Sequence, residues 1–497
     1  MIRVTPKIKY DCDVMIVGAG PAGSGLAFHL ASKGIKVTVV ESAVFPRDKI
    51  CGDGVSPIAL AELDKMGITH TKEFDQTNEI NKVGLFLKDD KVFIDLSKPD
   101  HLPYHARIIP RIELDNWIYT AAKNAGATYI EGTSVTEYLS SENGVVVHLK
   151  SGENKSTLKT KLLVGADGGN STIARQLHGR KPNDEFQLLG LRAYYDNVNG
   201  PNDRVDIYFN EDGFPGIFWM FPVGEKGANV GIAMISKTFP SKPDHVKKIL
   251  LAHIENNKDI KERIGEGELS DKIRGWPITF FNPKQKLSDN RIILIGEAAG
   301  LINPLSGDGI QYALLSARWA SETIEECVKE NRFSAQDLNK FTLKVKEEVA
   351  YDFSLSNLLV QFPRNKTFTK MWIKILTVMI AKAKEDKEYA DTIAGIFEGT
   401  YPSYHALNLS FILKTLKQGG VELSNSFQEH LTDPQKSITT GAEMMELFTK
   451  IMSEVKDNPK QHLKWIADTV LKTGTVAKHV VKTVDLESLS GVFRTEK

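Results

Sequence analysis

The first forty residues contain a short apolar strand, a glycine-rich turn, a helix and a second strand. Residues 13–17 form the first strand, and the turn reads Gly18-x-Gly20-x-x-Gly23. Leucines at helical spacing follow over residues 24–33, and residues 36–40 form the second strand. This order predicts a β–α–β unit that opens a parallel sheet covered by helices.

Each glycine of the turn has a mechanical reason. Gly18 permits the tight turn, Gly20 lets backbone amides approach a pyrophosphate, and Gly23 allows close helix–strand packing. The helix N-terminus adds partial positive charge for the phosphates, and Glu41 at the end of the second strand would accept hydrogen bonds from ribose hydroxyls. A glycine-rich turn without a ligand is the alternative. The motif by itself does not separate FAD from NAD.

Composition excludes several other classes of protein. The 497 residues include 63 Lys and Arg and 63 Asp and Glu, so there is no basic excess for nucleic acid. Three scattered cysteines do not suggest a disulfide framework, so we expect a cytoplasmic protein. The charged N-terminus does not resemble a signal peptide. The long uncharged stretch, residues 14–32, is the glycine turn rather than a membrane span.

The rest of the chain predicts a discontinuous architecture. Period-2 alternation over residues 204–234 indicates an antiparallel sheet, and residues 291–296 return to a buried strand. Beyond Phe333, apolar residues at helical spacing predict a helical C-terminal region, including a methionine-rich stretch at 444–455. We therefore expect a Rossmann-type domain over residues 10–84, 104–180 and 289–330, a β-sheet substrate domain over 85–103 and 181–288, and a helical region over 331–497.

Two later glycine-rich segments narrow the choice of cofactor. Residues 165–171 (Gly-Ala-Asp-Gly-Gly-Asn-Ser) follow a strand, and residues 295–310 follow another strand and open a helix. Together with the first turn, they resemble the three motifs of the flavin monooxygenase and geranylgeranyl reductase superfamily over about residues 10–330. The resemblance implies an FAD-dependent oxidoreductase. Glu297 stands where that family usually has Asp, although a carboxylate acceptor remains.

The resemblance also implies a set of cofactor-binding residues. Arg111 is similar to the arginine that reaches the flavin phosphate or ribityl region, the alternative being a solvated arginine at a helix start. The helix that begins near Gly309 would direct its N-terminal dipole at the N1/O2 side of a reduced flavin. The expected FAD-binding residues are Gly18, Gly20, Pro21, Ala22, Gly23, Glu41, Ser42, Arg47, Cys51, Gly52, Arg111, Asp167, Gly168, Gly296, Glu297, Pro304, Gly307, Gly309 and Ile310.

Two further stretches resemble geranylgeranyl reductases more narrowly. Residues 45–57 are similar to the proline-to-Cys-Gly loop of that family, which implies that Cys51 and Gly52 lie near the flavin ring and the substrate. Cys51 is either a packing residue or a chemically active thiol. Residues 215–222 are similar to the family strand Tyr-x-Trp-x-Phe-Pro, with Ile217 replacing the tyrosine. We place Trp219 and Phe221 beside the reaction for that reason.

Alternation along that strand puts Ile217, Trp219 and Phe221 on one face and Phe218 and Met220 on the other. The first face would line an apolar cavity over the flavin, and the second would pack on the domain. An ordinary sheet core is the alternative for any one of them. Loss of the tyrosine hydroxyl favours a wholly apolar substrate.

The predicted function is reduction of C=C bonds in an isoprenoid lipid or other apolar polyene by hydride from reduced FAD. A monooxygenase or halogenase is the second hypothesis, although the halogenase strand Trp-x-Trp-x-Ile-Pro is matched only at Trp219 and Pro222. A non-catalytic prenyl-binding protein is the third. NADPH, NADH or ferredoxin would supply electrons, since no second dinucleotide motif is present.

No metal is expected, because the histidines lack metal-ligand spacing and no zinc motif occurs. Residues 370–384 and 401–416 mix lysines with apolar side chains. Such helices lie in a membrane interface or pack on the core as cavity walls. Peripheral membrane contact, the oligomeric state and the role of residues 421–497 stay open.

Overall fold

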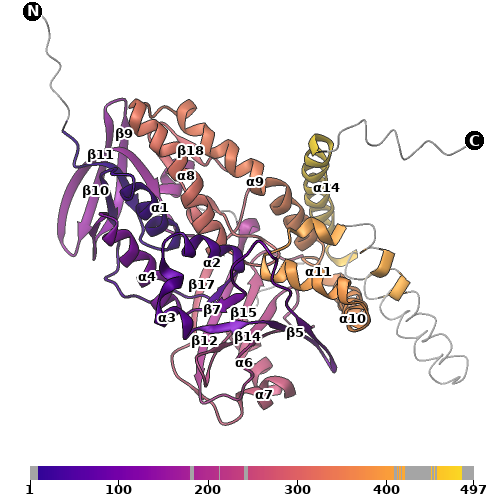
Figure 1. Ribbon diagram of the computed structural model, residues 1–497. Helices are drawn as coiled ribbons and strands as arrows, with labels where there is room; N and C mark the ends of the chain where they lie inside the picture. The colour runs from indigo at the N-terminus through magenta and orange to yellow at the C-terminus, as the bar shows by residue number, and fades with distance from the viewer. Residues whose placement is uncertain are drawn as a thin grey trace, which may run out of the picture.

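The computed structural model describes residues 9–179, 184–211, 213–239, 245–407, 411, 413–415, 417–419, 449, 453 and 456–483. In Figure 1 one large sheet lies at the left and the other at the lower centre, with helices packed along and beside them. A parallel sheet, an antiparallel sheet and a helical C-terminal region were all expected from the sequence. That prediction of fold class is confirmed.

The first sheet has a parallel centre and antiparallel edges. Its order is β18-β19-β11-β1-β2-β8, and β10 joins β11 to β9. Pairs among β19, β11, β1, β2 and β8 are parallel. Its strands are β1 (Cys12–Val17), β2 (Val37–Val40), β8 (Thr128–Ile130), β9 (Ser134–Ser141), β10 (Gly144–Ser151), β11 (Asn154–Gly165), β18 (Ser288–Asp289) and β19 (Ile292–Leu294).

Four of these parallel strands are followed closely by a residue that was expected to bind a cofactor. Gly18 follows β1, Glu41 follows β2, Asp167 follows β11 and Glu297 follows β19. Because carboxyl ends of neighbouring parallel strands meet at one edge, segments nearly 280 residues apart come together there.

The second sheet is antiparallel apart from one pair. Its order is β16-β12-β15-β14-β13-β5-β6, with β17 beside β12, and β13 pairs with β5 in parallel. The strands are β5 (Lys82–Leu87), β6 (Asp90–Asp95), β12 (Gln187–Asp196), β13 (Arg204–Phe209), β14 (Ile217–Val223), β15 (Gly227–Ile235), β16 (Glu268–Leu269) and β17 (Arg274–Thr279). The expected division at residues 84 and 85 falls inside β5, because the whole strand pairs with β6 and β13.

A small third sheet lies beside the two large ones. It comprises β3 (Gly54–Val55), β7 (Ala106–Ile108) and β4 (Asn78–Ile80), in the order β3-β7-β4. The strand β3 directly follows the Cys51 loop, so this sheet anchors the loop.

Helices cover the first sheet and form the C-terminal region. The α-helices are α1 (Pro21–Ala31), α2 (Pro57–Asp64), α3 (Lys72–Asp75), α4 (Arg111–Asn124), α5 (Thr172–His178), α6 (Val246–Asn256), α7 (Lys258–Ile264), α8 (Ile310–Glu330), α9 (Ala335–Gln361), α10 (Thr369–Glu385), α11 (Lys387–Glu398) and α14 (Pro459–Thr483). Short 3₁₀ turns are η1 (Ile68–His70), η2 (Asp184–Phe186), η3 (Gly296–Ala299), η4 (Lys366–Phe368) and η5 (Ser403–Leu407).

The long helix α9 shows how spacing in the sequence fixes packing. Leu338, Phe341, Val345, Val349 and Phe353 were expected on one face, and all five are buried in the core of the first sheet. Ser334 caps the helix through reciprocal bonds with Asp337, which explains where it begins. Helix α9 therefore packs the first part of the C-terminal region onto the core of the first sheet.

The helices α10 and α11 lie beside β5 and β6 (Figure 1). They bury Ile373, Ile380 and Ile393 in a cluster with side chains from both strands, so residues 370–384 pack on the second sheet. No helix in the described part of the chain is long and apolar enough to cross a bilayer. The expected methionine-rich helix at 444–455 falls almost entirely outside the described residues.

Candidate active site

The Gly18 turn leads from β1 into α1, and its three glycines have different surroundings. Gly18 has φ +98°, and a Cβ there would overlap the Ala166 carbonyl. A Cβ on Gly23 would overlap the carbonyl of Gly18, so Gly23 permits close packing within the turn. Gly20 is different, since its nearest neighbour would be the Arg47 guanidinium at 3.7 Å. Two glycines thus shape the turn, while Gly20 keeps a cavity open.

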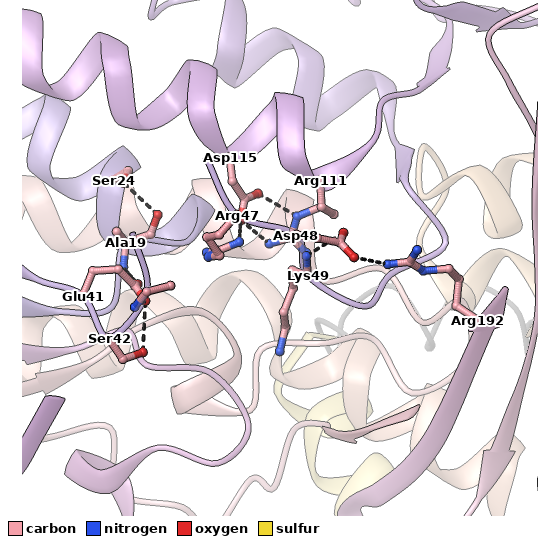
Figure 2. Close-up of polar contacts among 11 residues, drawn as sticks. Ala19, Ser24, Glu41, Ser42, Arg47, Asp48, Lys49, Arg111, Asp115 and Arg192 are labelled. Carbon is pink, nitrogen blue, oxygen red and sulfur yellow. Dashed lines mark hydrogen bonds and ion pairs between the residues drawn. The ribbon is translucent and has the colours of Figure 1, made fainter. Parts of the chain in front are cut away.

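Glu41 ties this turn to the end of β2 (Figure 2). One carboxylate oxygen accepts the Ala19 amide at 2.7 Å, and the other accepts the Ala43 amide at 2.9 Å and the Ser42 hydroxyl at 3.1 Å. Gly20 is the N-cap of α1, and no side chain caps the helix. The first amides of α1 therefore face the cavity without a side-chain acceptor, which suits an anionic ligand.

A buried ion cluster lies across the cavity from the Gly18 turn. Asp115 on α4 accepts two hydrogen bonds from Arg111, at 2.6 and 2.8 Å, and one from Arg47 at 2.5 Å (Figure 2). Burial by itself raises the pKa of Asp115, but the two guanidinium groups outweigh burial and hold it below its usual value. Arg111 is 7% exposed, so the alternative of a solvated arginine is wrong.

The loop between Arg47 and Gly54 forms one wall of the cavity. Lys49 lies over the Trp276 ring, 3.4 Å from its centroid, and burial lowers the pKa of the lysine to about 8 although Glu297 opposes that shift. Cys51 and Gly52 face the cavity. Burial raises the pKa of the Cys51 thiol against the opposing charge of Arg111, so this thiol is protonated at neutral pH.

A hydrogen-bond network behind the loop holds it against the second sheet. Asn229 on β15 donates to the Cys51 carbonyl at 2.8 Å and to Asp53 at 2.7 Å, and it accepts the Trp219 indole at 2.9 Å. The Tyr194 hydroxyl donates to Asp53 at 2.5 Å. The network therefore fixes Cys51 and Trp219 relative to each other.

The strand β14 forms the apolar wall next to the loop. Ile217, Trp219 and Phe221 line the cavity, whereas Phe218 and Met220 are buried in a separate cluster on the other side of the sheet. Side chains of this strand therefore alternate between the cavity and the core, as the sequence predicts. A Cβ on Gly52 would lie 3.3 Å from the Phe221 ring, so the loop and the strand are in close contact.

The segments that follow β11 and β19 supply two further carboxylates, Asp167 and Glu297. Asp167 accepts the Ser171 hydroxyl at 2.5 Å and the Thr172 amide at 2.7 Å, so it also caps α5. Glu297 accepts the Thr279 amide at 3.3 Å. Burial raises the pKa of both carboxyl groups, and Lys49 opposes that rise at Glu297.

These walls enclose a cavity of about 700 Å³, within the usual range for small-molecule sites. It is lined by most of the predicted residues, namely Gly18, Gly20, Pro21, Ala22, Glu41, Ser42, Arg47, Cys51, Gly52, Arg111, Asp167, Gly168, Trp219, Phe221, Glu297, Gly307, Gly309 and Ile310. Gly23, Gly296 and Pro304 do not line it. Gly23 and Gly296 serve close packing instead, since a Cβ on Gly296 would lie 2.7 Å from Ala22.

The FAD-binding domain family matches residues 11–332, which is more than half of the chain. The chain belongs to the FAD-binding domain family. The three glycine-rich segments and the three carboxylates that follow strands all lie within the matched region. The helical C-terminal region lies beyond it.

Curated relatives of this FAD-binding protein include reductases. The menaquinone reductase of Mycolicibacterium smegmatis is 29% identical over 318 residues, which cover 62% of this chain and 75% of the relative. Digeranylgeranylglycerophospholipid reductase 2 of Methanopyrus kandleri is 28% identical over 349 residues, 69% of this chain and 84% of the relative. The expectation of an FAD-dependent oxidoreductase with geranylgeranyl reductase-like relatives is confirmed.

Solved structures share the fold. A geranylgeranyl bacteriochlorophyll reductase-like protein from Thermoplasma acidophilum superposes with a TM-score of 0.63 at 21% identity, over 76% of this chain and 92% of that one. A flavin-dependent halogenase superposes with a TM-score of 0.60 at 20% identity, over 76% of this chain and 73% of that one. At such identities the likeness is one of fold, common to reductases and halogenases.

The cavity of this FAD-binding protein fits an extended dinucleotide. Its polar end has uncapped helix amides at Gly20, the Arg47 guanidinium and the Glu41 carboxylate. At the other end Gly307, with φ +73°, has open space around it next to the N-terminus of α8, whereas a Cβ on Gly309 would lie 2.9 Å from Ile302. We expect phosphates beside Gly20 and Arg47 and the flavin ring between the Gly307–Gly309 segment and the Cys51 loop.

Sequence reasoning missed several residues that shape the site. Lys49, Trp276 and Glu398 line the cavity, and Asp53 and Asn229 brace the Cys51 loop from behind. Lys49 and Asp53 stand inside the loop that was singled out, so a buried charged residue beside two glycines was an available signal. No local signal marks Glu398 or Asn229, because their roles arise only from contacts with distant segments.

Proposed function

We propose that this protein is an FAD-dependent reductase that saturates a C=C bond of an isoprenoid lipid, either free or as the prenyl chain of a quinone. The observation that carries the proposal is the apolar half of the cavity. Ile217, Trp219 and Phe221 line it from β14, and Ala394 and Phe397 line it from α11. Val83, Leu96 and Ile108 add further aliphatic surface. Such walls favour a hydrocarbon chain over a polar substrate.

When bound and reduced, FAD supplies the hydride in this chemistry. The chain positions the substrate and keeps water out. The Asn229 network holds Trp219 and the Cys51 carbonyl together, so the apolar wall and the loop form a fixed slot. A fixed slot lowers the entropic cost of placing an alkene next to the cofactor.

The names of the curated relatives agree with this substrate class. One relative is called a menaquinone reductase and another a digeranylgeranylglycerophospholipid reductase, and both names indicate reductases of prenyl-bearing molecules. We propose NAD(P)H or ferredoxin as the source of electrons. Loose contact with a bilayer would let such a substrate enter, and we propose it on the chemistry of the substrate alone.

An anaerobic reoxidation experiment tests the function. The FAD-loaded protein is reduced with dithionite and mixed with geranylgeranyl lipids, which carry no quinone ring, in detergent while the flavin absorbance is recorded. We expect reoxidation without oxygen and a product two mass units heavier. A fully saturated phytanyl lipid of the same length is the control, since it occupies the slot but has no double bond.

The competing chemistry gives a different result. If only oxygen reoxidises the flavin, and the lipid changes the yield of hydrogen peroxide, the protein is a monooxygenase or halogenase. If the protein binds the lipids but never takes up FAD, it is a prenyl-binding protein without redox activity.

A further inference from the structure

The C-terminal helix α11 brings a carboxyl group into the apolar end of the cavity. Asp386 caps the start of the helix by accepting the Tyr389 amide at 3.0 Å, and Gly399, with φ +81°, ends it. Ala394, Phe397 and the last helical residue, Glu398, line the cavity. Phe397 packs in the same cluster as Ile217 and Phe221, so Glu398 approaches the face of the cavity that we assign to the substrate.

The Glu398 carboxyl has few partners. Its Oε2 accepts the Thr400 hydroxyl at 3.3 Å, while its Oε1 is shielded from solvent and has no hydrogen-bond partner. Burial raises the pKa of Glu398 to about 7, although Thr400 and the Ala106 amide oppose the rise. The position at a helix C-terminus further disfavours a negative charge, because the helix dipole is negative there.

The end of α11 is fitted closely to the segment expected beside the flavin ring. A Cβ on Gly399 would lie 2.9 Å from the Asp308 carboxyl and 3.0 Å from the Gln311 side-chain oxygen. Ser56 donates to the same Gln311 oxygen at 2.8 Å and lies 3.8 Å from that Cβ. Glu398 is therefore held at a fixed place relative to Gly307–Gly309.

Asp308 is the second carboxyl at this end of the cavity, and its surroundings differ. It precedes α8 and accepts the Gln311 amide at 3.3 Å, so it lies at the positive end of a helix, where a carboxylate is stabilised. Burial nevertheless raises its pKa to about 6. Asp308 also lines the cavity, and its Oδ2 is buried without a hydrogen-bond partner. Of the two groups, Glu398 is the one that follows Phe397, which packs with Ile217 and Phe221 on the apolar side, whereas Asp308 belongs to the segment expected beside the flavin ring.

We propose that Glu398 is the general acid that protonates the substrate, an inference that rests on the proposed reductase function. Reduced FAD, when bound, would supply the hydride that forms a C–H bond at one alkene carbon. The other carbon takes the proton from the Glu398 carboxyl, so the C=C π bond and the O–H bond break and a second C–H bond forms. The bound FAD would be left oxidised, and the Glu398 carboxylate would regain its proton from water.

The substitution Glu398→Gln tests this role. Glutamine keeps the shape and neutrality of a protonated glutamate but cannot donate a proton. A positioned acid contributes about 10²- to 10⁴-fold to a rate, so we expect a loss of that order in single-turnover reoxidation by geranylgeranyl lipid. Lipid affinity, followed from the absorbance of the oxidised flavin, should stay unchanged. Glu388→Gln, an exposed position on the same helix, is the matched control and should keep the wild-type rate.

An infrared titration of the FAD-loaded protein gives a readout independent of turnover. We expect a protonated carboxyl band that disappears with a midpoint near pH 7, and its absence in Glu398→Gln. Asp308→Asn separates the two carboxyls, because it should leave that band in place. The rate with wild-type protein should fall as pH rises through about 7, since the acid is then ionised.

The outcomes distinguish the inference from the proposed function. If wild-type protein does not reduce any isoprenoid, the proposed function is wrong. If wild-type protein does reduce them and Glu398→Gln is equally fast, or if only Asp308→Asn is slow, the assignment of the acid to Glu398 is overturned. The assignment is also overturned if Glu398→Gln reacts in D₂O at the wild-type rate and its product carries deuterium at the same position as the wild-type product.

Discussion

The two ends of the cavity treat a buried carboxyl group in opposite ways. At the polar end, Asp115 has no exposed surface, yet its pKa is lowered because Arg111 and Arg47 surround it. At the apolar end, burial raises the pKa of Glu398 to about 7, because only a hydroxyl and an amide oppose it. Burial alone therefore does not decide the charge state, and the partner groups do.

This contrast matches what each end has to do. A cofactor with two phosphates needs fixed positive charge, which the arginines supply without titrating. A hydrocarbon substrate offers nothing to pair with an ion, so an ionised side chain beside it would be costly. A neutral acid is the polar group that such a slot tolerates.

The largest expected effect comes from breaking the ion cluster. Asp115→Asn leaves the buried Arg111 and the half-buried Arg47 without their shared counter-charge, so we expect the free energy of unfolding of this region to fall by about 3 to 5 kcal/mol. Hydrogen exchange of the α4 amides measures that local free energy. Glu113→Gln, an exposed change on the same helix, is the control and should alter exchange very little.

A drop no larger than that of Glu113→Gln would contradict this account. It would mean that water or relaxed side chains replace the carboxylate, and that the polar end does not depend on charge pairing.

The second effect is a pH dependence at Asp53, which lies between the two ends. Burial raises its pKa from 3.8 to about 6, despite hydrogen bonds from Tyr194 and Asn229. The folded state thus binds this proton more tightly than the unfolded chain does. The resulting stability is fully present below about pH 3.8 and is lost as pH rises through about 6, an effect on the order of 3 kcal/mol.

Urea midpoints at several pH values measure this difference. We expect the stability of wild-type protein relative to Asp53→Asn to fall between pH 4 and pH 7. Asp196→Asn, at the exposed end of the strand that carries Tyr194, is the control. Parallel pH curves for wild type and Asp53→Asn would show that Asp53 is not protonated in the folded state.

The polar end was largely predictable from the sequence, and the reason is local. A strand, a glycine turn and a helix occupy neighbouring residues, so Gly18, Gly20 and Glu41 carry their own context. The spacing of Leu338 to Phe353 likewise fixed the buried face of α9. Such signals need no knowledge of distant segments.

The supports of the apolar end could not be predicted in the same way. Asn229 bonds the Cys51 carbonyl across 178 residues, and no pattern near either residue announces the pair. Glu398 looks like an ordinary helical glutamate until α11 is placed against β6 and the Gly307–Gly309 segment. Its raised pKa comes from that packing and not from its neighbours in sequence.

A third change tests how closely the apolar wall is packed. A Cβ on Gly231 of β15 would overlap both the Trp219 ring and the Leu191 carbonyl. We expect Gly231→Ala to cost about 1 to 3 kcal/mol of stability and to displace Trp219 from Asn229. The shift of the Trp219 indole N–H resonance reports the displacement. Gly474→Ala on α14, where a Cβ would meet nothing within 4 Å, is the control and should be neutral or stabilising.

The smallest expected effect concerns Cys51, where the two ends meet. Because burial raises the pKa of this thiol, it is neither a thiolate nucleophile nor a strong acid at pH 7. Cys51→Ala removes one half-buried sulfur, so we expect a stability loss of about 1 kcal/mol and slow reaction of the wild-type thiol with iodoacetamide. Turnover with isoprenoid should change far less than in Glu398→Gln. A larger loss in Cys51→Ala that added thiol restores and Cys51→Ser does not would move the proton donor from α11 to the loop and reverse the roles assigned to the two walls.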